Sequence, residues 1–236
     1  MNNFQSPRPN LDAERRKFAH KGRGQLPDFL TPTATASLAK ALAAIEWRLV
    51  FNLGERHVDL SGTDQTTLGP EKLGVIVAEA TARAQSSFQY LYENYPIADL
   101  AAAGHLKIPG LRTIFAQLNS PETCALIEQV TGEKVDFCDM QATKYSGGHF
   151  LTPHDDAVAE KNRKIAYVLS LSPNWQQSWG GNLQFLSDSG ELEEEFVPRF
   201  NTISLFKIPV PHQVSPVSLL TPRPRYSLTG WFRTKD

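Results

Sequence analysis

Cysteine is scarce in this sequence, which contains only Cys124 and Cys138. Two cysteines cannot build the disulfide framework of a small secreted domain, so we expect both to be buried thiols. Long apolar stretches are also missing. No run approaches the roughly 18 residues of a membrane-spanning helix, and the opening MNNFQSPRPN lacks the apolar segment of a signal peptide. These absences lead us to expect a cytoplasmic protein with no membrane partner.

Neither sign of charge is in excess. The chain has 24 basic and 25 acidic residues, which gives a formal net charge of −1. Non-specific nucleic-acid binders rely on a strong positive field, so we expect no nucleic-acid partner. With 236 residues, of which 41% are hydrophobic, the chain can bury one substantial core. The composition sets no oligomeric state.

Helices are expected in the first half of the chain. Ala-Leu periodicity predicts a helix over 31–45. Apolar residues at spacings of three and four predict a second helix over 70–92. A third is expected after Asn119, which stands at capping-box spacing from Glu122.

The second half of the chain is typical of β structure. From Val135 onward, short β-rich runs such as "KIAYVLSLS", "NTISLFKI" and "RYSLTGWF" are separated by turn residues. Helices first and strands later predict an α+β fold in which the second half is a β-sandwich or jelly-roll barrel. The helices would then pack on one sheet.

We expect one folded domain over residues 26–236. Within it, residues 26–134 would be the helical support and residues 135–233 the β-rich core. Residues 1–25 are rich in charged residues, Gly and Pro and have few large apolar side chains. We therefore predict a flexible N-terminal arm there, with a short helix at 11–20.

One short stretch, "GHFLTPHDD", combines two histidines with a doubled aspartate. If it is extended, His154 and Asp156 point to the same face and Asp155 points away. A histidine and a carboxylate on one face are two thirds of a 2-His-1-carboxylate site for non-haem Fe(II). The alternative is a polar turn in which one aspartate caps a local amide. We expect His149 to be a loop residue and not a ligand.

Two residues further along the chain extend this pattern. His212, in "KIPVPHQVSPV", opens a β-rich run, and Arg225 opens "RYSLTGWF". In a strand, Arg225, Thr229 and Trp231 share one face. An arginine fork is suited to bidentate capture of a carboxylate. A core histidine and a surface arginine are the structural alternatives.

Taken together, these segments resemble the 2-oxoglutarate/Fe(II)-dependent dioxygenases, in the prolyl-hydroxylase branch. The resemblance rests on "KYSGGHFLTPHDD", "RKIAYVLSLSPNWQQSWGGNLQFL", "VPRFNTISLFKIPVPHQVSPV" and "RYSLTGWF", which cover roughly residues 141–232. Among subgroups, the chain is most similar to the ribosomal-protein prolyl hydroxylases and their bacterial relatives. The resemblance implies a double-stranded β-helix, or jelly-roll, core with supporting N-terminal helices.

The resemblance also implies roles for individual residues. The metal ligands would be His154, Asp156 and His212, with no catalytic residue beyond them. Arg225 would bind the far carboxylate of 2-oxoglutarate, with Arg223 as its competitor. The remaining positions that the resemblance assigns are Tyr145, Thr229 and Ser170 around the cosubstrate, and Leu183, Val214 and Trp231 as inward-facing residues of the substrate pocket.

Ser170 departs from the family pattern, because close relatives commonly carry a tyrosine at this position. The tyrosine hydroxyl helps to hold the 2-oxoglutarate carboxylate, and serine is too short to reach as far. We expect a water molecule, Tyr145 or Thr229 to take over. The fine geometry of cosubstrate binding is thus open, while the expected metal ligands are unaffected.

The function that the resemblance implies is hydroxylation of a prolyl residue in a protein or peptide, in which translation-machinery proteins are candidate partners. The cofactors would be Fe(II), 2-oxoglutarate and O2, with ascorbate as a supporting reductant, and the products succinate and CO2. Hydroxylation of a free amino acid or another small molecule is the alternative. Nucleic-acid demethylases carry a second arginine where this chain has Trp231, which disfavours that activity, and a non-catalytic relative is disfavoured by the complete ligand set.

Overall fold

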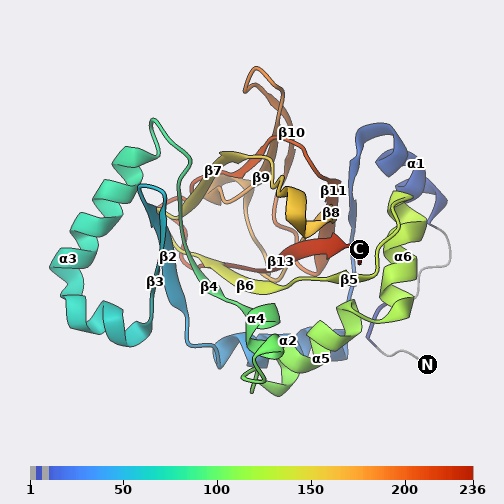
Figure 1. The fold of residues 1–236 in the computed structure, drawn as a ribbon, viewed down its shortest axis with the longest axis horizontal. Helices are drawn as coiled ribbons and strands as arrows, with labels where there is room; N and C mark the ends of the chain where they lie inside the picture. Colours follow the sequence, from blue (N-terminus) through green and yellow to red (C-terminus); the bar gives the residue numbers. More distant parts are fainter. Residues whose placement is uncertain (1–3, 7–10, 236) are drawn as a thin grey trace.

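An antiparallel sheet that curls on itself dominates the structure, a computed structural model that describes residues 4–6 and 11–235 (Figure 1). The strands are β1 (Arg23–Leu26), β2 (Arg48–Leu53), β3 (Arg56–Leu60), β4 (Tyr90–Tyr95), β5 (Phe137–Cys138), β6 (Gln141–Tyr145), β7 (Phe150–His154), β8 (Arg163–Ser170), β9 (Leu183–Leu186), β10 (Leu192–Phe196), β11 (Thr202–Lys207), β12 (His212–Val214) and β13 (Arg225–Arg233). The helices are α1 (Asp12–Lys21), α2 (Pro32–Ala43), α3 (Gly62–Arg83), α4 (Ile97–Ala102), α5 (Pro109–Leu118) and α6 (Pro121–Thr131), with short 3-10 turns at Ala159–Lys161 and Gln177–Trp179.

The order of the strands places distant parts of the sequence side by side. Along the sheet the order is β1-β11-β8-β13-β6-β4-β7-β12-β9-β10, and β2 and β3 extend from β4 as a hairpin. From β7 to β13, consecutive strands lie on opposite halves of this path, except for the hairpin of β9 and β10, as in a jelly roll. The predicted α+β fold with a jelly-roll core is confirmed.

Strand alternation divides the sheet into a helix-facing side and an inner side. On β8, Ile165, Tyr167 and Leu169 are almost fully buried in the main hydrophobic core, which also contains side chains of α2, α5 and α6. Figure 1 shows these helices and α4 along the outer side of the sheet, while α3 stands apart beside β2 and β3. The opposite side of β8 and β13 is left to line the interior of the curl.

The helix predicted over 31–45 is present as α2. The helix predicted over 70–92 is present as the second part of α3, but its predicted end is wrong, because α3 ends at Arg83 and the chain forms β4 from Tyr90. Tyr90 and Leu91 pair with β7, and the end of β4 pairs with β6, so sheet hydrogen bonds outweigh the apolar spacing. Among the described helices, none is both long enough and apolar enough to cross a membrane.

Two further local expectations need correction. Ser120, not Asn119, caps α6, because its hydroxyl accepts the backbone N–H of Thr123. The segment expected as a flexible arm contains α1, which matches the short helix predicted at 11–20, and then joins the sheet as β1. Phe18 is fully buried in the main core, and β1 pairs with β11 and forms one end of the sheet. Residues 1–3 and 7–10 of this segment lie outside the described residues. Cys124 and Cys138 are both buried free thiols, as expected.

Asn201, just before β11, ties the segment that precedes α2 to the sheet. Its Oδ1 accepts the backbone N–H of Leu30, and its Nδ2 donates to the Leu30 carbonyl oxygen, each over 2.8 Å. Its backbone carbonyl also accepts the N–H of Phe29. The residue is buried and has a φ of +56°, a left-handed conformation that asparagine tolerates better than most residues.

We expect Asn201→Ala to lower the free energy of unfolding by about 2–4 kcal/mol, since it leaves a buried peptide group unpaired and places alanine in a left-handed conformation. Urea unfolding followed by circular dichroism measures the change. The matched control is Asn174→Ala, because Asn174 has a similar φ of +54° but is exposed. Equal losses in the two variants would mean that the side-chain bonds of Asn201 add nothing.

Candidate metal centre

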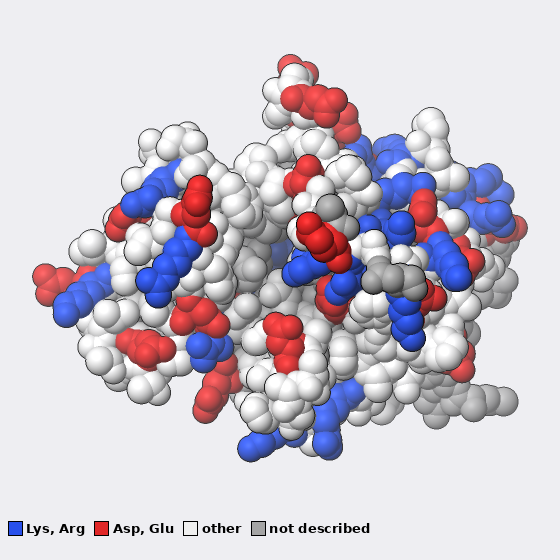
Figure 2. Space-filling model, viewed as in Figure 1, with Lys and Arg blue, Asp and Glu red and all other residues white. Residues whose placement is uncertain are grey.

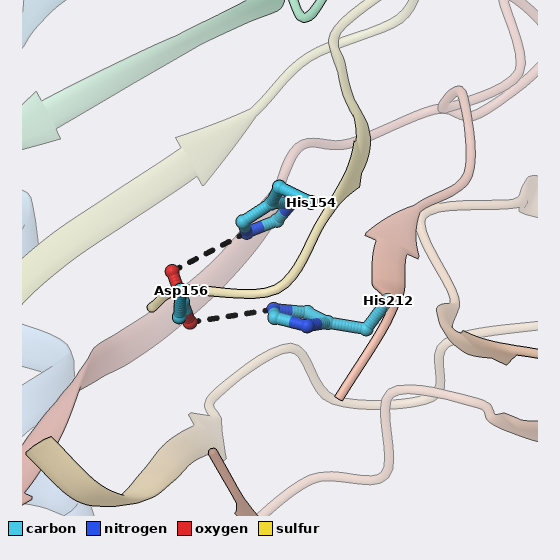
Figure 3. A group of neighbouring side chains, drawn as sticks. All are labelled: His154, Asp156 and His212. Atoms are coloured by element: carbon cyan, nitrogen blue, oxygen red, sulfur yellow. Dashed lines mark ion pairs between the residues drawn. The ribbon is translucent and has the colours of Figure 1, made fainter. Parts of the chain in front are cut away.

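Three side chains from two neighbouring strand ends converge inside the curl of the sheet (Figure 3). His154 Nε2 lies 3.5 Å from Asp156 Oδ1, and His212 Nε2 lies 3.4 Å from Asp156 Oδ2. One ligand atom from each residue lies within 4.8 Å of the others. Two imidazoles and a carboxylate at this spacing form a set of donors that can bind one divalent metal ion.

The register of β7 against β12 sets the two histidines directly opposite each other. His212 is paired directly with His154, and their ring centroids are 4.1 Å apart. Asp156 follows the end of β7 and has a φ of +62°, so it is not extended as expected. This left-handed turn brings its carboxylate back toward both rings. Asp155 is exposed, and its Oδ1 accepts the backbone N–H of Ala157.

Backbone carbonyl groups fix the orientation of both imidazoles. His154 Nδ1 lies 3.0 Å from the carbonyl oxygen of Thr152, and His212 Nδ1 lies 2.8 Å from that of Val210. With Nδ1–H donating to a carbonyl oxygen, Nε2 carries the lone pair that a metal needs. Both Nε2 atoms point toward Asp156, as Figure 3 shows.

The carboxylate of Asp156 remains ionised in this environment. Burial by itself would raise the pKa of this group, but its close contacts with the His154 and His212 rings lower that pKa well below its usual range. The indole Nε1–H of Trp231 also donates to Asp156 Oδ2 over 2.9 Å. An ionised, oriented carboxylate is the form that binds a metal.

Arg225 is a buried cation deeper in the same cavity. It is only 2% exposed, its Nε has no hydrogen-bond partner, and among residues 4–6 and 11–235 it forms no salt bridge. Burial lowers its pKa, and the ring of Tyr145 lies 5.2 Å from its Cζ. Gly181 makes room for it, since a Cβ there would lie 3.1 Å from Arg225 Cδ. Arg223, its competitor, is exposed and donates to the carbonyl of Pro173.

The ligands and Arg225 line a cavity of about 520 Å³. Of the other positions expected around the cosubstrate and substrate, the cavity is lined by Tyr145, Leu183, Val214, Thr229 and Trp231. Ser170 is buried but is not among the lining residues. His149 is also absent from the wall and lies in the turn between β6 and β7, where its Nδ1 accepts the backbone N–H of Ser146.

Strand β4 supplies an aromatic wall that the sequence-based prediction missed. Tyr90, Tyr92 and Asn94 alternate along β4 and line the cavity. The rings of Tyr92 and Tyr145 are stacked, with centroids 5.0 Å apart. Burial raises the pKa of Tyr92 to about 12, so its hydroxyl remains a proton donor at neutral pH. The alternation in "YLYEN" was the available signal, and it was hidden by the helix assigned to this stretch.

We expect Asp156→Ala to weaken binding of Mn(II), a stand-in for Fe(II) that is stable in air, by more than about 100-fold, because a direct ligand matters more than an outer partner. Asp155→Ala is the matched control and should bind as wild type, since Asp155 is exposed and bonds only its own turn. Isothermal titration calorimetry measures both. Equal losses from the two substitutions would contradict the assignment of Asp156.

Comparison with known proteins points to one family. Residues 140–233 match the model of the 2OG-Fe(II) oxygenase superfamily. The chain is 29% identical over 172 residues to the prolyl 3-hydroxylase sudestada1 of Drosophila melanogaster, a match that covers 66% of this chain and 31% of that protein. It is 36% identical over 101 residues to the prolyl 3-hydroxylase OGFOD1 of Xenopus laevis, a match that covers 40% of this chain and 19% of that protein. The chain thus spans less than a third of the length of these curated relatives.

Solved structures share the fold. A prolyl-4-hydroxylase of Pseudomonas putida superposes with a TM-score of 0.61 at 21% identity, covering 96% of this chain and all of that one. A prolyl hydroxylase of Trichoplax adhaerens, solved with a peptide of a hypoxia-inducible factor, superposes with a TM-score of 0.59 at 16% identity. The match covers 94% of this chain and 88% of that one. Residues 140–233 thus match the core of the 2OG-Fe(II) oxygenase superfamily, and these solved structures share the fold of the chain.

Proposed function

We propose that this chain is a 2-oxoglutarate- and Fe(II)-dependent hydroxylase that acts on a prolyl residue of a protein or peptide. The observation that carries the proposal is the pairing of two features in one cavity: a His-Asp-His donor set, and a buried arginine without an acidic partner among the described residues. The donor set suits a divalent metal ion, and the buried arginine suits the free carboxylate of a 2-oxo acid.

The residues present fit Fe(II). Two neutral imidazole nitrogens and one carboxylate form a mixed nitrogen and oxygen set that leaves coordination positions open, which is typical of non-haem Fe(II) oxygenases. His154, Asp156 and His212 would hold the ion. When bound, Fe(II) supplies the activation of O2 that is coupled to decarboxylation of 2-oxoglutarate and yields succinate, CO2 and a hydroxylated carbon.

Arg225 fits the cosubstrate. A buried guanidinium without an acidic partner is costly unless a ligand completes it, and a carboxylate can accept two parallel N–H bonds from the arginine fork. Tyr145 lies against this guanidinium, and burial raises the pKa of Tyr145 well above its ordinary value, so its hydroxyl stays a donor. Tyr92, stacked on Tyr145, offers a second neutral hydroxyl in the cavity, which Ser170 does not line.

The rest of the cavity would hold the substrate and exclude water. Tyr90 and Phe88 continue the aromatic wall outward from Tyr92, and Phe88 is 48% exposed at its outer end. Flat apolar rings can pack against the ring of a prolyl residue, and an open aromatic margin can accept flanking residues of a peptide. This wall and the prolyl 3-hydroxylase names of the curated relatives support a peptidyl substrate over a free amino acid.

For the biological setting, we propose a cytoplasmic enzyme whose substrate belongs to the translation machinery. The proposal follows the similarity of the sequence to ribosomal-protein prolyl hydroxylases. A nucleic-acid substrate is disfavoured, because Trp231 stands where demethylases carry a second arginine. Figure 2 adds that acidic and basic side chains are interspersed on the face that it shows.

Arg225→Met should raise the dissociation constant for 2-oxoglutarate by about 10–100-fold, since hydrogen bonds to a charged group contribute about 1.5–3 kcal/mol. Titration calorimetry on the Mn(II)-loaded protein measures the change. Arg223→Met is the control, because Arg223 is exposed and should leave the affinity unchanged. If Arg223→Met lowered the affinity for 2-oxoglutarate and Arg225→Met did not, Arg223 would be the residue that binds the carboxylate.

The substrate is tested by comparing a host proteome with and without the gene by mass spectrometry. In the host with the wild-type gene, we expect one proline to carry an additional oxygen atom. In a host that carries the Asp156→Ala variant instead, the same proline should stay unmodified. Purified enzyme is then offered the matching peptide and free proline in parallel. Hydroxylation of free proline but not of the peptide would favour the small-molecule alternative. Release of succinate without hydroxylation of either the peptide or free proline would contradict prolyl hydroxylation.

A further inference from the structure

Two side chains that are not among the three candidate metal ligands donate hydrogen bonds to Asp156. The indole Nε1–H of Trp231 donates to Asp156 Oδ2 over 2.9 Å, and Arg163 Nη1 donates to the Asp156 carbonyl oxygen over 3.0 Å. The two side chains also contact each other, because Arg163 Cζ lies 3.5 Å from the centroid of the indole ring. Together they fix both the carboxylate and the backbone of one residue.

Asp156 needs this support more than the two histidines do. Each histidine sits on a strand whose neighbours are fixed by the sheet, and each ring is anchored by a backbone carbonyl group. Asp156 lies beyond the end of β7, in a left-handed turn with a φ of +62°. Without external bonds, its side chain could rotate among several rotamers.

We propose that Trp231 and Arg163 are positioning residues that make Asp156 a ligand through a single oxygen. Both oxygens lie near a histidine Nε2, but the bond from Trp231 engages Oδ2 and leaves Oδ1 as the oxygen that binds the metal. Arg163 fixes the turn that aims the carboxylate and packs on the indole that holds it. This inference rests on the proposed Fe(II) site. A carboxylate that binds through one oxygen leaves room for the chelating cosubstrate and for O2.

The surroundings of both residues agree with a supporting role. The Arg163 side chain is 9% exposed, and its charge faces the Asp156 carboxylate, whose Oδ1 lies 3.9 Å from Nη1. Trp231 was expected only as a wall of the substrate pocket, and it does line the cavity. Its N–H nevertheless points at a ligand, which a phenylalanine of similar shape could not reproduce.

Trp231→Phe tests the inference, because it removes the N–H donor and keeps an aromatic ring beneath Arg163. Wild type and variant are titrated with Co(II) by calorimetry while visible absorption is recorded. We expect the dissociation constant to rise by about 10–100-fold, the usual effect of losing an outer partner of a metal ligand. We also expect weaker visible absorption, since Co(II) absorbs less strongly when a second carboxylate oxygen raises its coordination number.

Trp47→Phe is the matched control, because Trp47 lies outside the cavity and packs on Tyr226. It should leave the affinity and the spectrum unchanged. Wild-type affinity and spectrum in Trp231→Phe would overturn the inference. If wild type binds Co(II) no better than His212→Ala does, the proposed metal site itself fails, and the inference fails with it.

Circular dichroism shows whether Trp231→Phe is folded. Should it not fold, Arg163→Met tests the other half of the support, because it removes the donor to the Asp156 carbonyl oxygen. We expect that variant to bind Co(II) about tenfold more weakly. Unchanged affinity in a folded Arg163→Met protein would contradict the proposal.

Discussion

The antiparallel pairing of β7 with β12 is the constraint on which the site depends. It sets His154 directly opposite His212, although many residues separate them in the sequence. A slip of one residue would turn one imidazole to the other face of the sheet. The curl of the sheet maintains this register, because β12 is also paired with β9 on its other side. The donor set is therefore a product of the whole jelly roll and not of one motif.

The same strands serve two purposes because their faces alternate. On β13, Leu228 and Phe232 are buried in the helix-covered core, whereas Arg225, Thr229 and Trp231 line the cavity. Apolar burial on one face stabilises the sheet that carries a costly buried cation on the other. The helices of the first half thus contribute to the site indirectly, by fixing the strands that form its floor.

The sequence allowed the jelly roll and the converging residues to be predicted, since alternation in β8 and β13 is regular and the H-x-D pattern is local. It did not allow the geometry at Asp156 to be predicted, because a left-handed turn there replaces the expected extended strand. The Trp231 bond depends on that turn and on the curl together. Tyr92 was missed because apolar spacing over 70–92 resembles a helix, whereas pairing with β6 and β7 makes its end a strand.

The central claim is that one Fe(II) ion held by His154, Asp156 and His212 is chelated by 2-oxoglutarate that Arg225 anchors. Its most direct test is an anaerobic titration of the Fe(II)-loaded protein with 2-oxoglutarate, followed by visible absorption. A 2-oxo acid chelated to Fe(II) gives a charge-transfer band, and the account predicts one that saturates at a single equivalent in wild type and is absent in His212→Ala. No band in wild type, or an equal band in the variant, would contradict it.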